Sequence, residues 1–110
     1  MEDAMTEECT LEFKPDGRVH LLGALTFDTC TRLYRAMKRH LDHGSCPSEL
    51  DLSGVVAVDS AGLALLLEWQ SVCTKAGKAL SVEGAPDSLL ELARLCGAEK
   101  RLQLNGREAA

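Results

Sequence analysis

The segment from Leu50 to Leu63 restricts the fold of this chain more than any other stretch of its sequence. It starts with the alternating apolar residues typical of a β-strand, passes through a short loop, and continues with Asp59-Ser60-Ala61-Gly62 at the start of a strongly apolar helix. A strand that leads so directly into a helix predicts a β-α unit, the building block of a parallel sheet. The same spacing places the Ser60 hydroxyl at the positive end of the helix dipole. A hydroxyl there is suited to receive a phosphate group or to contact a partner, whereas catalysis would require a base beside it.

The sequence before this segment predicts an antiparallel hairpin followed by a helix. Apolar and polar residues alternate over 9–13 and again over 19–23, and Pro15-Asp16-Gly17 between them is a turn sequence. A helix is expected over roughly residues 26–43, because apolar residues recur there at spacings of three and four. The apolar stripe of this helix is formed by Cys30, Leu33, Met37 and Leu41.

The remaining elements are predicted from the same two periodicities. A third strand is expected around 50–52, a second helix over about 61–76, and a fourth strand around 80–82. A third helix is expected over 88–97, opened by the capping-box sequence of its first four residues, Ser-Leu-Leu-Glu. The apolar residues at 102–104 either form a last short strand or dock the tail.

The predicted element order, β-β-α-β-α-β-α, indicates an α/β fold with a small mixed sheet and helices packed mainly on one face. Strands joined through a helix must run parallel, with right-handed crossovers, whereas the opening hairpin is antiparallel. No internal repeat or linker divides the chain, so we expect one domain over residues 9–104, with a disordered tail at 1–8 and a second tail at 105–110.

Composition and charge argue against several classes of protein. The chain has 110 residues and a formal net charge of −5, whereas nucleic-acid-binding proteins usually present a basic face. Its longest apolar run, Leu63–Leu67, is much shorter than the roughly 20 residues of a membrane span. The N-terminus is acidic and has no apolar signal region behind it, so we expect a cytoplasmic protein. The five cysteines are scattered, and we expect reduced thiols that mostly act as small buried hydrophobic residues.

Two features of the second helix can each be interpreted in two ways. Ser60 can be the N-cap of the helix, or Asp59 can take that role and leave the Ser60 hydroxyl free for a partner. The run Leu63–Leu67 is apolar on every side, so the helix is either sandwiched between its neighbours and the sheet or partly exposed. In the second case Trp69 would contribute to an apolar docking patch, because tryptophan is enriched at interface hot spots.

The sequence gives little support to catalysis or metal binding. Ser60 lacks a Gly-x-Ser-x-Gly elbow, since Val58 occupies the first glycine position, and no phosphate-binding glycine loop is present. The histidines at 20, 40 and 43 have no evident route to Ser60. His40, His43 and Cys46 are spaced like metal ligands, but histidines are common at helix C-termini because of the dipole, so we expect no metal and no cofactor.

One further group of charges lies on the first predicted helix. These basic residues are Arg32, Arg35, Lys38 and Arg39. They alternate with apolar positions, so an amphipathic surface helix with a solvated face explains them.

The central segment resembles a known signature. Asp51-Leu52-Ser53-Gly54-Val55 followed by Val58-Asp59-Ser60-Ala61-Gly62-Leu63 is similar to the motif of STAS domains, the sulfate-transporter and anti-sigma-factor-antagonist modules. Leu22-Gly23-Ala24-Leu25 resembles their Gly-Glu-Leu-Asp segment, with Ala24 in place of Glu and Thr26 in place of Asp. Leu92–Ala98 resembles their last helix and its glycine stop, so the resemblance extends over roughly residues 9 to 104.

The resemblance implies a binding module without catalysis. The partner-binding residues it implies are Ser60, Asp59, Ala61, Gly62 and Leu63, with Thr26 and Asp28 on the adjacent loop. In one branch of the family, which the apolar run from Gly62 to Trp69 favours, the module is a small cytoplasmic subunit of a phospholipid ABC transporter of the Mla type. It would bind the ATPase subunit (MlaF-type), stabilise or activate it, reach the inner membrane only through the complex, and support outer-membrane lipid asymmetry. In the alternative branch the chain is an anti-sigma factor antagonist that an anti-sigma factor kinase phosphorylates on Ser60.

Overall fold

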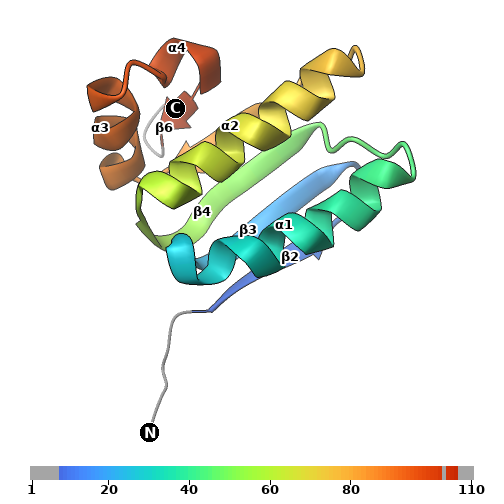
Figure 1. Cartoon of the computed structure of the whole chain (residues 1–110), viewed down its shortest axis with the longest axis horizontal. Helices are drawn as coiled ribbons and strands as arrows, with labels where there is room; N and C mark the ends of the chain where they lie inside the picture. The colour runs from blue at the N-terminus through green and yellow to red at the C-terminus, as the bar shows by residue number, and fades with distance from the viewer. Residues whose placement is uncertain (1–7, 103, 107–110) are drawn as a thin grey trace, which may run out of the picture.

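The order of strands and helices in the computed structural model follows the predicted pattern, with one additional short helix near the C-terminus (Figure 1). The structure describes residues 8–102 and 104–106. The elements are β2 (Cys9–Phe13), β3 (Arg18–Leu25), α1 (Phe27–Asp42), β4 (Glu49–Val58), α2 (Ser60–Lys75), β5 (Ser81–Ala85), α3 (Asp87–Leu95), α4 (Glu99–Leu102) and β6 (Leu104–Gly106). The predicted α/β class is therefore confirmed.

The sheet is mixed, as the hairpin and the β-α units predict. Its strand order is β2-β3-β4-β5-β6, with β2 antiparallel to β3 and every other neighbouring pair parallel. Val19, Leu50 and Val82 pair across β3, β4 and β5, and all three are buried. The adjacent row, which includes His20 and Asp51, points to the opposite face because side chains alternate along a strand.

The helix α2 lies in the middle of the helical layer, and this position explains why it is so apolar. Figure 1 shows α1 and α2 crossing the same face of the sheet, with α3 and α4 beyond α2. The helix contacts α1 on one side, α3 and α4 on the other, and β4 beneath it. Leu63 and Leu66 are buried, and Trp69 is only 1% exposed. The sandwiched interpretation is correct, and the interpretation of Trp69 as part of an exposed docking patch is wrong.

Two strands are longer than the sequence predicts. The short loop expected before Asp59 is absent, because β4 continues to Val58 and the helix α2 follows at Ser60. In the same way β3 continues through Gly23 to Leu25 instead of ending at the glycine. The added residues of β3 pair with the added residues of β4, with Gly23 opposite Val55 and Leu25 opposite Val58. Pairing between the two strands therefore overrides the local signal for a turn.

The C-terminal region departs from the prediction in two respects. The capping box at Ser88 does not form, because α3 begins one residue earlier, at Asp87, and Pro86 is its N-cap. The Pro86 carbonyl accepts from the N–H groups of Leu89 and Leu90 and so starts the helix. The short α4 was not predicted, since only one of its four residues, Leu102, is apolar and no periodicity marks it. Of the two leucines expected to form a last strand or to dock the tail, Leu102 ends α4 and only Leu104 lies in a strand, β6. This strand pairs in parallel with β5 and extends to Gly106, inside the stretch that was predicted to be a tail.

The cysteines are free thiols in different surroundings, and only part of the prediction about their burial is correct. Cys9 and Cys73 are buried, two others are partly buried, and Cys96 is exposed. Burial raises the pKa of the Cys9 thiol. Burial, and after it the neighbouring Cys46 thiol, raises the pKa of Cys73 to about 12.

Thiol reactivity should follow the exposure of the cysteines. At about pH 8 an aromatic disulfide reagent should modify Cys96 first, while Cys9 and Cys73 react only as the domain unfolds, because the thiolate is the reactive form. The measurement is the release of the coloured thiol with and without denaturant. The variant Cys96→Ser should lose the fastest phase. Reaction of Cys73 at the same rate as Cys96 would show that the packing beneath α2 is open.

Candidate functional site

The helices α1 and α2 begin next to each other at one edge of the sheet, where β3 and β4 end (Figure 1). Thr26 is the N-cap of α1 and Asp59 is the N-cap of α2. We call this region the helix-start edge. Its residues are Thr26, Phe27, Asp28, Asp59, Ser60 and Ala61.

A single carboxylate, that of Asp59, ties the two helix starts together. Its Oδ1 accepts from the N–H of Gly62 at 3.0 Å, which caps α2. Its Oδ2 accepts from the N–H of Phe27 at 2.9 Å, which caps α1 from a position 32 residues away in the sequence. Each helix start has backbone N–H groups without a partner inside the helix, and one side chain satisfies a donor on both. Asp59 therefore sets the relative positions of the residues on the edge.

The next two residues of the motif lie under the edge and support it. Gly62 is buried, and a Cβ added there would lie 2.2 Å from the carbonyl oxygen of Leu25 at the end of β3. Leu63 is 3% exposed and belongs to the core. The backbone of α2 can approach β3 this closely only because residue 62 has no side chain. In the isolated domain these two predicted binding residues hold the edge in place and do not reach its surface.

Thr29 fixes the first turn of α1 against the end of β3. Its hydroxyl accepts from the N–H of Thr26 at 3.1 Å and donates to the carbonyl of Ala24 at 2.8 Å. Thr29 is fully buried, whereas Thr26 is partly buried and Asp28 is exposed in the first helical turn. A carboxylate at that position is stabilised by the helix dipole. Thr26 occupies the N-cap position of α1, and Asp28 lies inside its first turn.

Ser60 is exposed, because Asp59 supplies the cap and leaves the serine as the first residue of the helix. The second interpretation of the motif, with Asp59 as the cap, is therefore the correct one. Ala61 beside it is partly buried. Of the predicted partner-binding residues, the structure brings Ser60, Asp59, Ala61, Thr26 and Asp28 together on the helix-start edge.

Phe27 is a surface feature of this edge that sequence reasoning missed. It is 77% exposed, although its N–H is bonded to Asp59. Phe27 precedes Cys30 by three residues and so continues the apolar spacing of α1, a spacing that by itself favours burial. Val56, at 80% exposed, is a second large apolar side chain without cover near the end of β4. A large exposed aromatic on the same edge as an exposed hydroxyl is typical of a contact surface.

The charges on the helix-start edge are negative. Asp28 and Asp59 contribute carboxylates, and neither segment that forms the edge, 24–31 or 54–66, contains a lysine or arginine. Burial, and after it the Asp59 carboxylate, raises the pKa of the nearby Cys30 thiol. Cys30 therefore stays protonated and is a poor nucleophile.

No imidazole approaches Ser60 in the part of the chain that the structure describes. His20 binds the carboxylate of Asp51 at 2.5 Å on the open face of the sheet, and His40 packs its ring against Phe13 with centroids 4.3 Å apart. His43 contacts the carbonyl of Arg39 through Nδ1 at 2.7 Å. Partial burial alone would raise the pKa of the Asp51 carboxyl, but hydrogen bonds from Ser53 and the interaction with His20 outweigh it and lower this pKa. Beside Ser60, the two oxygens of the Asp59 carboxylate accept from the N–H groups of Gly62 and Phe27, so this carboxylate is engaged in capping.

Of the other charged groups singled out in the sequence, Arg32 lies one helical turn after Asp28, and the rest lie farther from the edge. Within residues 8–102 and 104–106, no group of three or more His, Cys, Asp or Glu side chains is arranged to hold a metal ion. The basic residues of α1 are exposed, and Lys38 pairs with Asp42 one turn later at 3.1 Å, as expected for a solvated face. Among the described helices, none combines the length and apolar character needed to cross a bilayer.

A family model described as "Mlab, STAS domain" matches residues 9–105. Comparison with curated protein sequences gives no match.

Several solved structures are similar to this chain. A protein assigned as an anti-sigma factor antagonist from Thermotoga maritima has a TM-score of 0.73 and 15% identity, over 88% of this chain and 85% of that one. The Bacillus cell fate determinant SpoIIAA in its phosphorylated form has a TM-score of 0.67 and 12% identity, over 91% and 92%. A sulfate transporter family protein from Wolinella succinogenes has a TM-score of 0.64 and 23% identity, over 83% and 76%. At these identities the similarity establishes the fold alone.

Proposed function

This chain belongs to the Mlab STAS-domain family, and from that premise we propose that it is a binding subunit that docks through its helix-start edge onto the ATPase of a phospholipid ABC transporter. It would act in the cytoplasm and reach the inner membrane only as part of the complex. Binding would stabilise or activate the ATPase and so support the lipid traffic that maintains outer-membrane asymmetry. STAS domains act through protein–protein contacts, and the chemistry around Ser60 agrees with a role in binding.

The observation that carries this proposal is the pairing of an exposed hydroxyl with an exposed aromatic on a rigid support. Ser60 and Phe27 lie on two different helices whose starts are joined by Asp59 at 2.9 and 3.0 Å. A preorganised surface loses little conformational freedom on binding, so more of its contact energy appears as affinity. Phe27, at 77% exposed, supplies the large apolar anchor around which binding energy usually concentrates.

The alternative function is an anti-sigma factor antagonist switched by phosphorylation of Ser60. The exposure of Ser60 at the start of α2 supports it, because a helix N-terminus stabilises an added phosphate. The charges favour the first proposal, since a phosphate of about −1.5 to −2 would be placed beside two aspartates with no lysine or arginine on the edge. A partner would have to supply the compensating cations.

Replacing Ser60 by arginine should weaken docking without unfolding the domain. The side chain starts on the surface at the first helical residue, where bulk is tolerated in the free protein but clashes with a closely packed partner. We expect affinity for the ATPase subunit to fall at least about tenfold, or about 1.4 kcal/mol. The measurement is co-purification and titration with an ABC ATPase subunit of the Mla type from the same organism, together with thermal melting of the isolated variant.

The matched control is Ser88→Arg, an exposed serine in the first turn of α3, which should bind as the unaltered chain does. Phe27→Ala should weaken binding like Ser60→Arg, because it removes the exposed anchor. Undiminished binding by both edge variants would rule out docking through this edge. A Ser60→Arg domain that unfolds would instead identify the serine as structural.

Intact-mass measurement of the chain purified from its own cells separates the two functions. A co-purifying ATPase and an unmodified mass support the transporter subunit. A mass increase of one phosphate that Ser60→Ala abolishes, with no ATPase present, would reverse the ranking in favour of the sigma pathway.

A further inference from the structure

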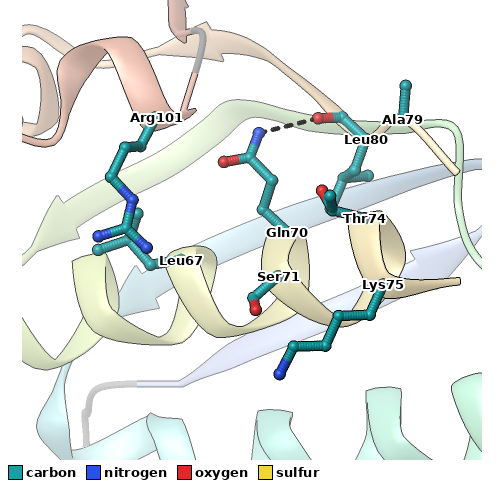
Figure 2. A pocket seen from close by; sticks show the side chains of 8 residues that line it. All are labelled: Leu67, Gln70, Ser71, Thr74, Lys75, Ala79, Leu80 and Arg101. Carbon is teal, nitrogen blue, oxygen red and sulfur yellow. Dashed lines mark hydrogen bonds between the residues drawn. The ribbon is translucent and has the colours of Figure 1, made fainter. Parts of the chain in front are cut away.

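A groove runs along the second half of α2, on the side of the helix that faces α4 and the residues before β5 (Figure 2). Its volume is about 430 Å³. This size lies in the range of small-molecule sites in proteins. The lining residues are Leu67, Gln70, Ser71, Thr74, Lys75, Ala79, Leu80 and Arg101.

The groove is held open by one glutamine. The amide nitrogen of Gln70 donates to the carbonyl of Leu80 at 3.0 Å and to the carbonyl of Leu102, also at 3.0 Å. The first of these bonds is drawn in Figure 2. Because Gln70 joins α2 both to the chain entering β5 and to the end of α4, the walls of the groove are fixed relative to each other. The site therefore does not have to be assembled by its ligand.

The polar groups of the groove are cationic and hydrogen-bonding. Lys75 and Arg101 line it from α2 and α4, and Ser71 and Thr74 add two hydroxyls. None of its lining residues is acidic, although the chain as a whole carries a net charge of −5. In Figure 2, Ser71 lies between the Lys75 and Arg101 side chains. Within the described residues neither cation forms an ion pair, so both are available to an anion.

We propose that this groove binds the phosphate group of a small phosphate monoester. Arginine can bind a phosphate through two parallel N–H bonds, lysine adds a compact positive charge, and hydroxyls donate to the remaining oxygens. Leu67, Ala79 and Leu80 give the groove an apolar part on which a short organic body can rest. The same group occurs in soluble phosphate esters and in the headgroup of phosphatidic acid in a membrane.

The groove is separate from the helix-start edge. Ser71 follows Ser60 by eleven residues on α2, which corresponds to about 16 Å along the helix. A ligand in the groove would leave Ser60 and Phe27 free, so phosphate binding and partner docking can occur together. This inference therefore does not depend on the identity of the docking partner.

The test is an NMR titration of the full chain with glycerol 3-phosphate at low ionic strength. The amide signals of Ser71, Thr74, Lys75 and Arg101 should shift and saturate. The double variant Lys75→Gln with Arg101→Gln should weaken binding at least about tenfold. The matched control, Lys78→Gln with Lys100→Gln, removes the same charge from exposed neighbours outside the lining and should bind within about twofold of the unaltered chain.

Equal losses of affinity in the two double variants would overturn the proposal, because binding would then reflect non-specific charge attraction. The absence of saturable shifts would overturn it as well, because no phosphate site would then exist.

Vesicles of phosphatidylcholine with and without phosphatidic acid identify the source of the phosphate. Binding to phosphatidic acid vesicles that needs Lys75 and Arg101 supports a lipid headgroup. Binding of glycerol 3-phosphate without vesicle binding supports a soluble ester.

Discussion

Replacing Gly62 by alanine is expected to lower the free energy of unfolding by about 2–3 kcal/mol. The added methyl carbon would lie 2.2 Å from the carbonyl oxygen of Leu25 and 2.9 Å from the Leu25 Cγ, so α2 and the end of β3 must move apart. The closest atom belongs to the backbone and cannot rotate away as a side chain can. Urea unfolding followed by circular dichroism measures the loss, and the thermal midpoint should fall by roughly 10 °C.

Gly44→Ala is the matched control, because it separates backbone conformation from crowding. Gly44 has a φ of 80°, and nothing lies within 4 Å of the position of an added Cβ. Alanine there should lower the free energy of unfolding by about 1–2 kcal/mol, which is the cost of the left-handed backbone conformation alone. Gly62 has no positive φ, and in an uncrowded helix interior its replacement by alanine would instead stabilise by up to about 1 kcal/mol. A neutral or stabilised Gly62→Ala protein would contradict the close approach of α2 to β3.

Replacing Asp59 by alanine is expected to destabilise the domain by a similar amount, about 2–3 kcal/mol, and to weaken docking as well. The substitution removes the cap of α2, worth about 1 kcal/mol, and leaves the Phe27 N–H without its charged acceptor, worth about 1.5 kcal/mol or more. Denaturant unfolding gives the stability, and titration with the partner gives the affinity. The affinity for the partner should fall because Ser60 and Phe27 are no longer held in place by the same carboxylate.

Two conservative variants of Asp59 divide this effect between its two bonds. A serine caps α2 well but is too short to reach Phe27, so Asp59→Ser should be about 1 kcal/mol more stable than Asp59→Ala. An asparagine has one acceptor oxygen and should satisfy only one of the two N–H groups. If Asp59→Ser were as stable as the unaltered chain, the bond to Phe27 would contribute nothing and the two helix starts would not be coupled through this residue.

Together these substitutions distinguish supporting residues from contacting ones. Gly62 and Asp59 act on affinity through the shape of the edge, so their effects on stability and docking should appear together. Ser60 and Phe27 are exposed, so their substitution should change docking with little change in stability. This difference can be measured even before the partner complex is solved.

The order of the elements and the class of the fold could be predicted from the sequence, because both depend on local periodicity. Alternation over Cys9–Phe13 and the apolar stripe of α1, with Leu33 and Met37 buried, each depend on neighbours within a few residues. Parallel pairing of β3 with β4 then follows from the helix between them. The Asp-Ser-Ala-Gly motif was also visible, since its residue types suit a helix start.

Tertiary structure alone decided how that motif is used. Asp59 caps α2 and leaves the Ser60 hydroxyl exposed, and the same carboxylate also accepts from the Phe27 N–H, 32 residues away, a contact that no local pattern reveals. Trp69 is buried because α1, α3 and α4 flank its helix, and Phe27 is exposed although the periodicity of α1 includes it. Periodicity reports which side of a helix is apolar, but cover for that side comes from segments distant in the chain, and only their packing determines which atoms remain free to bind.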